Sequence, residues 1–151
     1  MGALNVSDGV LDSRGPAPWA QAEMLAEPAP RRPAMVLIVD DEPAVRRLVD
    51  TVLRGAGYRT MVATSPSAAL ALASALGAPD ILVTDLKMPE MNGDQLAQRL
   101  RTAHPGVKVL YLTGFSHALF EYRPFLWENE QLLDKPFSIA GLLSAVADLN
   151  D

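Results

Sequence analysis

Three aspartates in this chain stand where apolar strands are predicted to end. Asp85 closes the segment 81–85, and Asp40 and Asp41 directly follow the segment 35–39. If the two strands are parallel neighbours, their carboxyl ends meet at one edge of a sheet and the three carboxylates crowd together. Such crowding is unfavourable unless a positive charge lies among the acids, so these residues predict a cation site.

Two more polar side chains follow predicted strand ends. Thr113 comes after a strand at 107–112, and Lys135 comes after a strand at about 131–134. Ligands of parallel α/β sheets bind beyond the carboxyl ends of the strands. Taken alone, Asp41 is explained as a helix cap, Thr113 as a turn residue and Lys135 as a solvated charge. Their joint placement favours a shared site.

Strands and helices alternate from Met35 onward. Strands are predicted at 35–39, 59–63, 80–85, 107–112 and 131–134. Helices are predicted after Asp41 as far as Gly55 and Gly57, from a Ser65 cap to near Gly77, over 92–104, and after a Ser138 cap. This alternation predicts a parallel sheet with helices on both faces, and right-handed crossovers leave few topologies.

Composition narrows the class of protein. A chain of 151 residues that is 49% hydrophobic and 21% charged has the length and composition of one globular domain. A net charge of −5 argues against sequence-independent nucleic-acid binding, which depends on Lys and Arg. The absence of Cys excludes disulfides and thiolate zinc sites, and two His exclude a His-rich metal site. No signal peptide or spanning segment is expected, so the prediction is a soluble, cytoplasmic protein without membrane contact.

Residues 1–34 differ from the rest of the chain. They hold five of the twelve prolines and no sustained apolar periodicity, which predicts a flexible Pro/Ala-rich tail with a short helical turn near Trp19–Leu25. The tail is either an unstructured leader or a docking segment that uses Trp19 as an anchor. The functional domain is expected to span 35–151.

Four blocks of residues, in order and with suitable spacing, carry a resemblance to a known family. They are Val39-Asp40-Asp41-Glu42, the run from Asp85 to Gly93 (Asp-Leu-Lys-Met-Pro-Glu-Met-Asn-Gly), Leu112-Thr113-Gly114, and Asp134-Lys135-Pro136-Phe137. The chain from about Met35 to Asn150 resembles the CheY-like receiver domain of two-component response regulators, of the single-domain or hybrid-kinase type. The resemblance implies a flavodoxin-like three-layer α/β sandwich whose five parallel strands have the order 2-1-3-4-5.

The resemblance also implies a mechanism. Asp85 would be the phospho-acceptor, taking a phosphoryl group from a histidine kinase or a histidine phosphotransfer protein. Mg²⁺ would be held by Asp41, Asp85 and the Lys87 carbonyl, with Asp40 acting mainly through water. Three aspartates, Lys135 and Mg²⁺ would then sum to zero charge before the phosphoryl group arrives.

The remaining positions follow from the same resemblance. Lys135 would bind one phosphoryl oxygen, and Thr113 would hydrogen-bond another once phosphate is present. Gly114 would leave room for the phosphoryl group, Gly93 would permit a tight loop into the next helix, and Pro136 would follow a cis peptide bond.

Two features depart from the family pattern. Leu132 stands where family members usually carry the aromatic residue that swings inward when the Thr engages phosphate. The segment between Thr113 and Lys135 predicts an atypical or shortened fourth helix. It gathers five aromatics: Phe115, Phe120, Tyr122, Phe125 and Trp127. These rings either cover the core where a regular helix is missing or form a partner-docking surface over 115–135.

The resulting prediction is a stand-alone receiver without an output domain, not an enzyme, which signals through protein contacts and binds no nucleic acid. Two alternatives stay open. One is a Mg²⁺-dependent aspartyl phosphatase, although no separate general acid is apparent near Asp40. The other is a scaffold that keeps the fold but is not phosphorylated.

Overall fold

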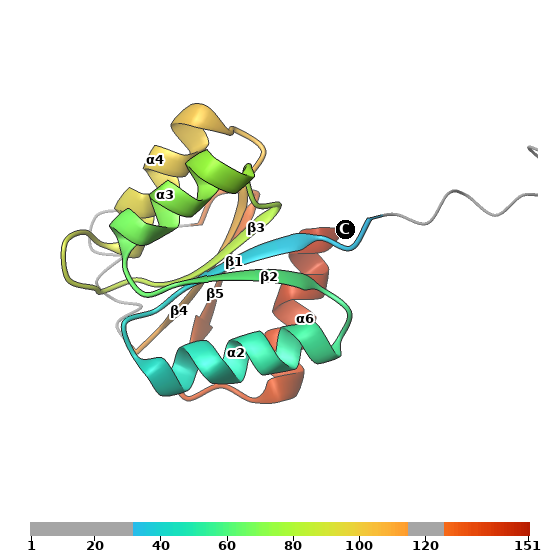
Figure 1. Cartoon of the computed structure of the whole chain (residues 1–151). Coiled ribbons are helices and arrows are strands. Elements are labelled where there is room, and N and C mark those ends of the chain that lie inside the picture. The colour runs from blue at the N-terminus through green and yellow to red at the C-terminus, as the bar shows by residue number, and fades with distance from the viewer. Residues whose placement is uncertain (1–31, 115–125) are drawn as a thin grey trace, which may run out of the picture. The chain divides into compact units, whose positions relative to one another are not determined.

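The computed structural model describes residues 32–114 and 126–151, which form a five-stranded parallel sheet between two pairs of helices (Figure 1). The strands lie in the order β2-β1-β3-β4-β5. Their bounds are β1 Met35–Val39, β2 Arg59–Ala63, β3 Ile81–Asp85, β4 Lys108–Thr113 and β5 Glu130–Asp134. The flavodoxin-like fold and the strand order predicted from the sequence are confirmed.

Four helices are present in the described part of the chain. They are α2 Pro43–Gly55, α3 Pro66–Leu76, α4 Gly93–Ala103 and α6 Ile139–Asn150. Figure 1 shows α3 and α4 on one face of the sheet and α2 and α6 on the other. The predicted caps are confirmed, since Ser65 Oγ accepts the Ala68 N–H at 3.2 Å and Ser138 Oγ accepts the Gly141 N–H at 2.9 Å.

Alternation along the strands divides the core into two apolar clusters, one on each face of the sheet. In β1, Leu37 and Val39 pack in the cluster that includes residues of α3 and α4, while Val36 and Ile38 pack in the cluster that includes residues of α2 and α6. All five residues of β3 are buried. A strand that is buried on both faces is typical of a central position in a parallel sheet, and it places Asp85 near the middle of the sheet's edge.

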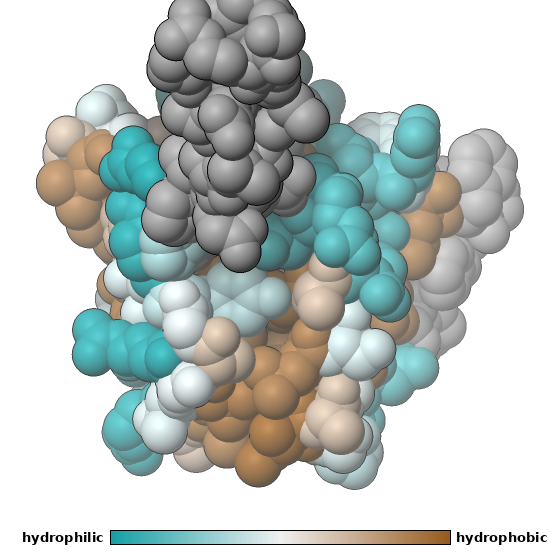
Figure 2. Space-filling model, turned by 90° about the vertical axis from the view of Figure 1, so that its right-hand side faces the viewer, coloured by the Kyte–Doolittle hydropathy of each residue, from teal (hydrophilic) through white to brown (hydrophobic). Residues whose placement is uncertain are grey.

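The surface view agrees with this layering. On the face drawn in Figure 2, apolar side chains gather in the lower half, at the height where α2 and α6 lie in Figure 1. Val52 of α2 and Leu143 of α6 are only partly buried where they pack on their cluster. Within residues 32–114 and 126–151, no helix has the length and apolar content needed to cross a membrane.

Predicted boundaries differ from the observed ones by a single residue at β3, β4 and β5, where strand pairing rather than local sequence fixes the ends. The helical turn expected near Trp19–Leu25 and the shortened fourth helix lie outside the described residues. So do four members of the aromatic cluster: Phe115, Phe120, Tyr122 and Phe125. The division into a tail of 1–34 and a domain of 35–151 stays a prediction.

The strand order creates the expected switch point. The chain leaves β1 to form β2 on one side and returns to form β3 on the other, so β1 and β3 are parallel neighbours, with Val39 opposite Thr84. On the far side, β4 and β5 pair with Thr113 opposite Asp134, and the Lys135 N–H donates to the Thr113 carbonyl at 3.0 Å. The polar residues after all four of these strands therefore meet at one edge.

Candidate functional site

The three aspartates that the sequence singles out lie together at the ends of β1 and β3. One carboxylate oxygen from each of Asp40, Asp41 and Asp85 lies within 4.8 Å of the others. Asp40 and Asp85 are buried, whereas Asp41 is exposed. The predicted convergence of three carboxylates is therefore observed, with one of them open to solvent.

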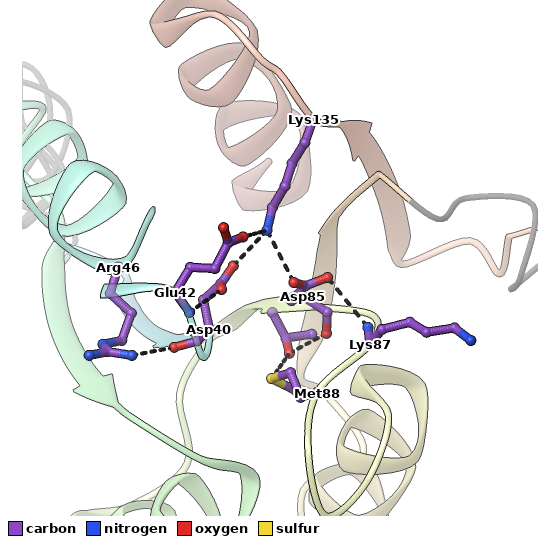
Figure 3. Close-up of polar contacts among 8 residues, drawn as sticks. Asp40, Glu42, Arg46, Asp85, Lys87, Met88 and Lys135 are labelled. Carbon is purple, nitrogen blue, oxygen red and sulfur yellow. Dashed lines mark hydrogen bonds and ion pairs between the residues drawn. The ribbon is translucent and has the colours of Figure 1, made fainter. Parts of the chain in front are cut away.

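Lys135 supplies the positive charge among these acids. Its Nζ lies 3.1 Å from Asp40 Oδ2 and 3.1 Å from Asp85 Oδ2 (Figure 3). A third carboxylate, that of Glu42, is closer still, with Oε1 at 2.8 Å. The ammonium group thus bridges the loop that follows β1 and the last residue of β3.

The pKa values of Lys135 and Asp40 reflect this arrangement. Burial acts to lower the pKa of Lys135, but its hydrogen bonds to Glu42, Asp85 and Asp40 outweigh burial and raise the pKa above its ordinary value. The pKa of Asp40 is raised because burial outweighs the Glu42 N–H and Lys135, which both favour its charged form. The two shifts favour the charged form of Lys135 and the protonated form of Asp40.

Backbone contacts fix the acceptor segment around Asp85. The Gly93 N–H donates to the Leu86 carbonyl at 2.7 Å, and a Cβ on Gly93 would collide with the Asp85 carbonyl oxygen. The Thr84 hydroxyl donates to the same Asp85 carbonyl at 2.8 Å, and the Lys87 N–H points to Asp85 Oδ1 at 3.4 Å. Gly93 is needed here for close approach, because it lets α4 begin directly against the backbone of Asp85.

Glu90 ties the loop that follows Asp85 to α3. Its φ of 78° lies in the left-handed region, which is rare for a residue other than Gly. Its carboxylate accepts the backbone N–H of Ser67 at 3.2 Å and the Ser67 hydroxyl at 3.3 Å. An acid at this position also lies near the positive end of the α3 dipole, which is favourable.

Two contacts around Asp40 were not predicted. Arg46 Nη1 donates to the Asp40 carbonyl at 2.6 Å, and the Glu42 N–H donates to Asp40 Oδ1 at 2.9 Å. The interpretation of Asp41 as the helix cap is wrong, because Glu42 is the N-cap residue of α2 and its side chain makes no capping bond. The sequence signal for Glu42 was its place as the third consecutive acid, directly after Asp40 and Asp41.

The zero charge balance expected for the site stays a prediction. Glu42 adds a fourth carboxylate to those of Asp40, Asp41 and Asp85, and the Arg46 guanidinium adds a positive charge at the Asp40 carbonyl. These two charges offset each other, so the sum with Lys135 and a divalent cation is unchanged.

The remaining predicted residues occupy the expected strand ends. Thr113 is fully buried at the end of β4, one residue beyond Leu112, the register partner of Asp85. No described atom lies within 4 Å of the place where a Cβ would stand on Gly114. The predicted cis peptide bond between Lys135 and Pro136 is present.

Leu132, which replaces the expected aromatic, pairs in register with Tyr111 of β4. Tyr111 is fully buried, and Leu132 packs against the same apolar cluster. The Tyr111 hydroxyl donates to Glu130 Oε2 at 2.8 Å. Tyr111 on β4 therefore supplies an aromatic ring to this apolar layer, and the hydrogen bond to Glu130 fixes its hydroxyl.

Glu130 is the centre of a buried polar network at the start of β5. Its Oε2 lies 3.0 Å from Nη1 of Arg101, and its Oε1 accepts the Trp127 N–H at 3.1 Å. The Arg101 guanidinium lies 5.7 Å from the centroid of the Trp127 ring, within cation–π range. This network joins α4, β4 and β5 at the opposite end of β5 from Lys135.

Comparison with known proteins decides the family. Residues 36–147 match the family profile of the response regulator receiver domain. The chain belongs to this receiver-domain family. Receiver domains are signalling domains of two-component systems, and the acidic group of Asp40, Asp41 and Asp85 fits aspartyl phosphorylation and Mg²⁺ binding.

Among relatives of this receiver domain, the sensor kinase CckA of Brucella abortus is 36% identical over 117 residues, which are 77% of this chain and 12% of the kinase. The response regulator receiver protein CpdR of the same organism is 30% identical over 112 residues, 74% of this chain and 92% of CpdR. Three further bacterial regulators share a match that spans only 45% to 48% of their length. The match to most of these relatives therefore concerns one part of a longer protein.

One solved structure of the same fold holds a ligand. The response regulator TrrA of Thermotoga maritima, in complex with Mg²⁺-BeF, is 30% identical with a TM-score of 0.66, covering 77% of this chain and 98% of TrrA. In the present receiver domain, the convergent atoms are carboxylate oxygens, the ligands that Mg²⁺ prefers. The donor set thus fits a magnesium ion.

Proposed function

We propose that this receiver domain accepts a phosphoryl group on Asp85 from the phosphohistidine of a histidine kinase or phosphotransfer protein. The P–N bond of the donor breaks as a P–O bond to an Asp85 carboxylate oxygen forms, and the leaving imidazole recovers a proton. The observation that carries the proposal is the Lys135 ammonium, 3.1 Å from the Asp85 carboxylate at the end of a buried strand. A carboxylate in this position can form an acyl phosphate, and the lysine offsets charge on the incoming group.

Mg²⁺ would be held by the carboxylates of Asp41 and Asp85 and by the Lys87 carbonyl. Asp40 would act through water, since its two carboxylate oxygens already accept from the Glu42 N–H and from Lys135. When bound, the ion would neutralise charge on the phosphoryl oxygens. The exposed Asp41 would keep the ion accessible from solvent.

Other side chains bind the phosphoryl group after transfer. Lys135 would donate to one phosphoryl oxygen and Thr113 to another. Thr113 ends β4, the neighbour of β3, and Lys135 directly follows β5, so both lie at the same edge of the sheet as Asp85. Gly114 would leave space beside Thr113, since among the described residues no atom outside its chain neighbours lies within 4 Å of a Cβ built there. The cis peptide bond joins Lys135 to Pro136.

The domain would signal through contacts with other proteins rather than by turnover of a small substrate. We place the phosphorylated unit at residues 35–151 and the partner surface around 115–135, with 1–34 as a tail. A cytoplasmic location and the absence of nucleic-acid contacts remain predictions from composition.

Labelling with a small phosphodonor tests the proposal. The wild type, incubated with radiolabelled acetyl phosphate and Mg²⁺, should take up acid-stable, base-labile label, and Asp85→Asn should take up none. Asp148→Asn, which removes an exposed acid on α6, is the matched control and should label like the wild type. An unlabelled wild type, or full labelling of Asp85→Asn, would contradict the proposal. Turnover of a phosphomonoester by the same samples would favour the phosphatase alternative.

A further inference from the structure

Glu42 occupies a position that links both sides of the acceptor site. Its backbone carbonyl accepts the Arg46 N–H, the first helical bond of α2, and its N–H donates to Asp40 Oδ1. Its carboxylate does not cap the helix but reaches Lys135, on the loop after β5, at 2.8 Å (Figure 3). A single residue therefore fixes an oxygen of Asp40 with its backbone and the ammonium of Lys135 with its side chain.

The donors of Lys135 are fully used in this arrangement. An ammonium group has three N–H donors, and three carboxylates lie within hydrogen-bond distance: those of Asp40, Glu42 and Asp85. Before transfer, while Asp85 is still a carboxylate, Lys135 can donate to an oxygen of the incoming phosphoryl group only if one of these acceptors is released. The three side chains differ in exposure, at 2% for Asp40, 10% for Asp85 and 60% for Glu42. Release of Glu42 into water costs least, because its carboxylate is already largely solvated.

We propose that Glu42 is a positioning residue that holds Lys135 away from the phosphoryl position before transfer and releases it when Asp85 is phosphorylated. This inference rests on the phosphorylation proposed above and concerns the regulation of that same site. Glu42 would slow phosphorylation in two ways, by occupying a donor of Lys135 and by adding a negative charge that repels an anionic donor.

Both effects of the Glu42 carboxylate slow phosphorylation of Asp85, so removing the carboxylate should raise the rate of phosphorylation. Loss of one unit charge beside a partly solvated phosphoryl site changes a rate by roughly five- to tenfold. Once Asp85 carries the phosphoryl group, Glu42 no longer holds Lys135, and the hydrolysis rate should depend little on it. The expected signature is a change in formation without a comparable change in decay.

The variant Glu42→Gln keeps the backbone N–H and the side-chain size while removing the charge. Glu128→Gln is the matched control, since Glu128 is an exposed acid beside Trp127, on the connection before β5. With acetyl phosphate at saturating Mg²⁺, acetate leaves as the new bond to Asp85 forms. Glu42→Gln should then label about five- to tenfold faster than the wild type, and Glu128→Gln at the wild-type rate. After donor removal, all three proteins should lose label at rates within about twofold.

A second measurement needs no donor and no metal. The chain has three lysines, Lys87, Lys108 and Lys135, so the ammonium ¹H–¹⁵N signals can be resolved and assigned. In metal-free protein, the Lys135 signal should shift and exchange faster with water in Glu42→Gln, but not in Glu128→Gln. An unchanged Lys135 signal refutes the pairing itself. A shifted signal with an unchanged or slower labelling rate refutes the regulatory role, whereas an unlabelled wild type overturns the proposed function and this inference with it.

Discussion

Replacing Gly93 by Ala tests how the acceptor edge is built. Gly93 begins α4, and a Cβ at this position would collide with the carbonyl oxygen of Asp85 and reach 3.0 Å from Cγ2 of Thr84. The obstructing atom is backbone at the end of a buried strand, so no flexible side chain can move aside. Relief would require α4 to move outward or the Asp85 carbonyl to turn away from the Thr84 hydroxyl.

The expected cost lies at the upper end of overpacking effects. Inserting a methyl group into a filled space costs about 1–3 kcal/mol, and the rigid backbone partner favours roughly 3 kcal/mol. For a chain of this size, each kcal/mol lowers the melting temperature by about 2–4 °C. We therefore expect Gly93→Ala to lose about 6–12 °C, and also to label more slowly because Asp85 is displaced.

Urea denaturation of Gly93→Ala and Gly55→Ala measures this effect with a matched control. Gly55 ends α2, has no heavy atom within 4 Å of a built Cβ and has no positive φ, so Ala there should stabilise by about 0.4–1 kcal/mol. Opposite signs for the two substitutions support the packing argument. Equal stabilities, or a loss below about 0.5 kcal/mol for Gly93→Ala, would show that α4 does not press on the Asp85 backbone.

Two further perturbations act on buried charges. Arg101→Met should cost about 3–5 kcal/mol in urea denaturation, because it removes the charged partner of the buried Glu130 carboxylate, whereas exposed Arg99→Met on the same helix should change stability by less than about 0.5 kcal/mol. A loss for Arg101→Met as small as that for Arg99→Met would contradict the argument that the Arg101–Glu130 ion pair stabilises the fold. The pKa of Asp40 is raised in the folded protein, so protonation of Asp40 stabilises the folded state. This contribution to the free energy of unfolding is fully present below the ordinary Asp pKa. It is lost as the pH rises through the pKa that Asp40 has in the folded protein. As the pH rises over this range, the metal-free wild type should lose stability relative to Asp40→Asn. As the pH falls over the same range, the affinity of the wild type for Mg²⁺, measured by calorimetry, should weaken. Parallel pH profiles of stability for the wild type and Asp40→Asn would contradict this reasoning.

The sequence was sufficient for the sheet and for the main residues of its edge. Apolar runs that end in Asp40 or Asp85 read as buried strands, and the Pro and Ser signals at helix starts are local properties of the chain. Alternation of strands and helices then leaves so few topologies that contacts between side chains far apart in the sequence can be predicted. The parallel sheet covered on both faces and the meeting of three carboxylates followed from these rules, whereas the strand order was implied by the resemblance to receiver domains.

The unforeseen contacts depend on side-chain reach rather than on pattern. Glu42 stood in the quoted motif, but a residue at the start of a helix normally caps it, and nothing local shows that its carboxylate turns toward Lys135 instead. Glu130 begins a strand, where an acid is usually exposed. Its burial requires Arg101 and Tyr111 to arrive from two other elements, which no short segment encodes.

The register pair of Tyr111 and Leu132 has a consequence for the evolution of these two positions. The two side chains belong to one apolar layer, and the total volume they fill is fixed by the elements around them. A ring on β4 leaves space for an aliphatic side chain on β5, and a ring on β5 would require the reverse. We therefore expect the residues at these two positions to covary among related proteins, with a large residue at one position accompanied by a smaller residue at the other.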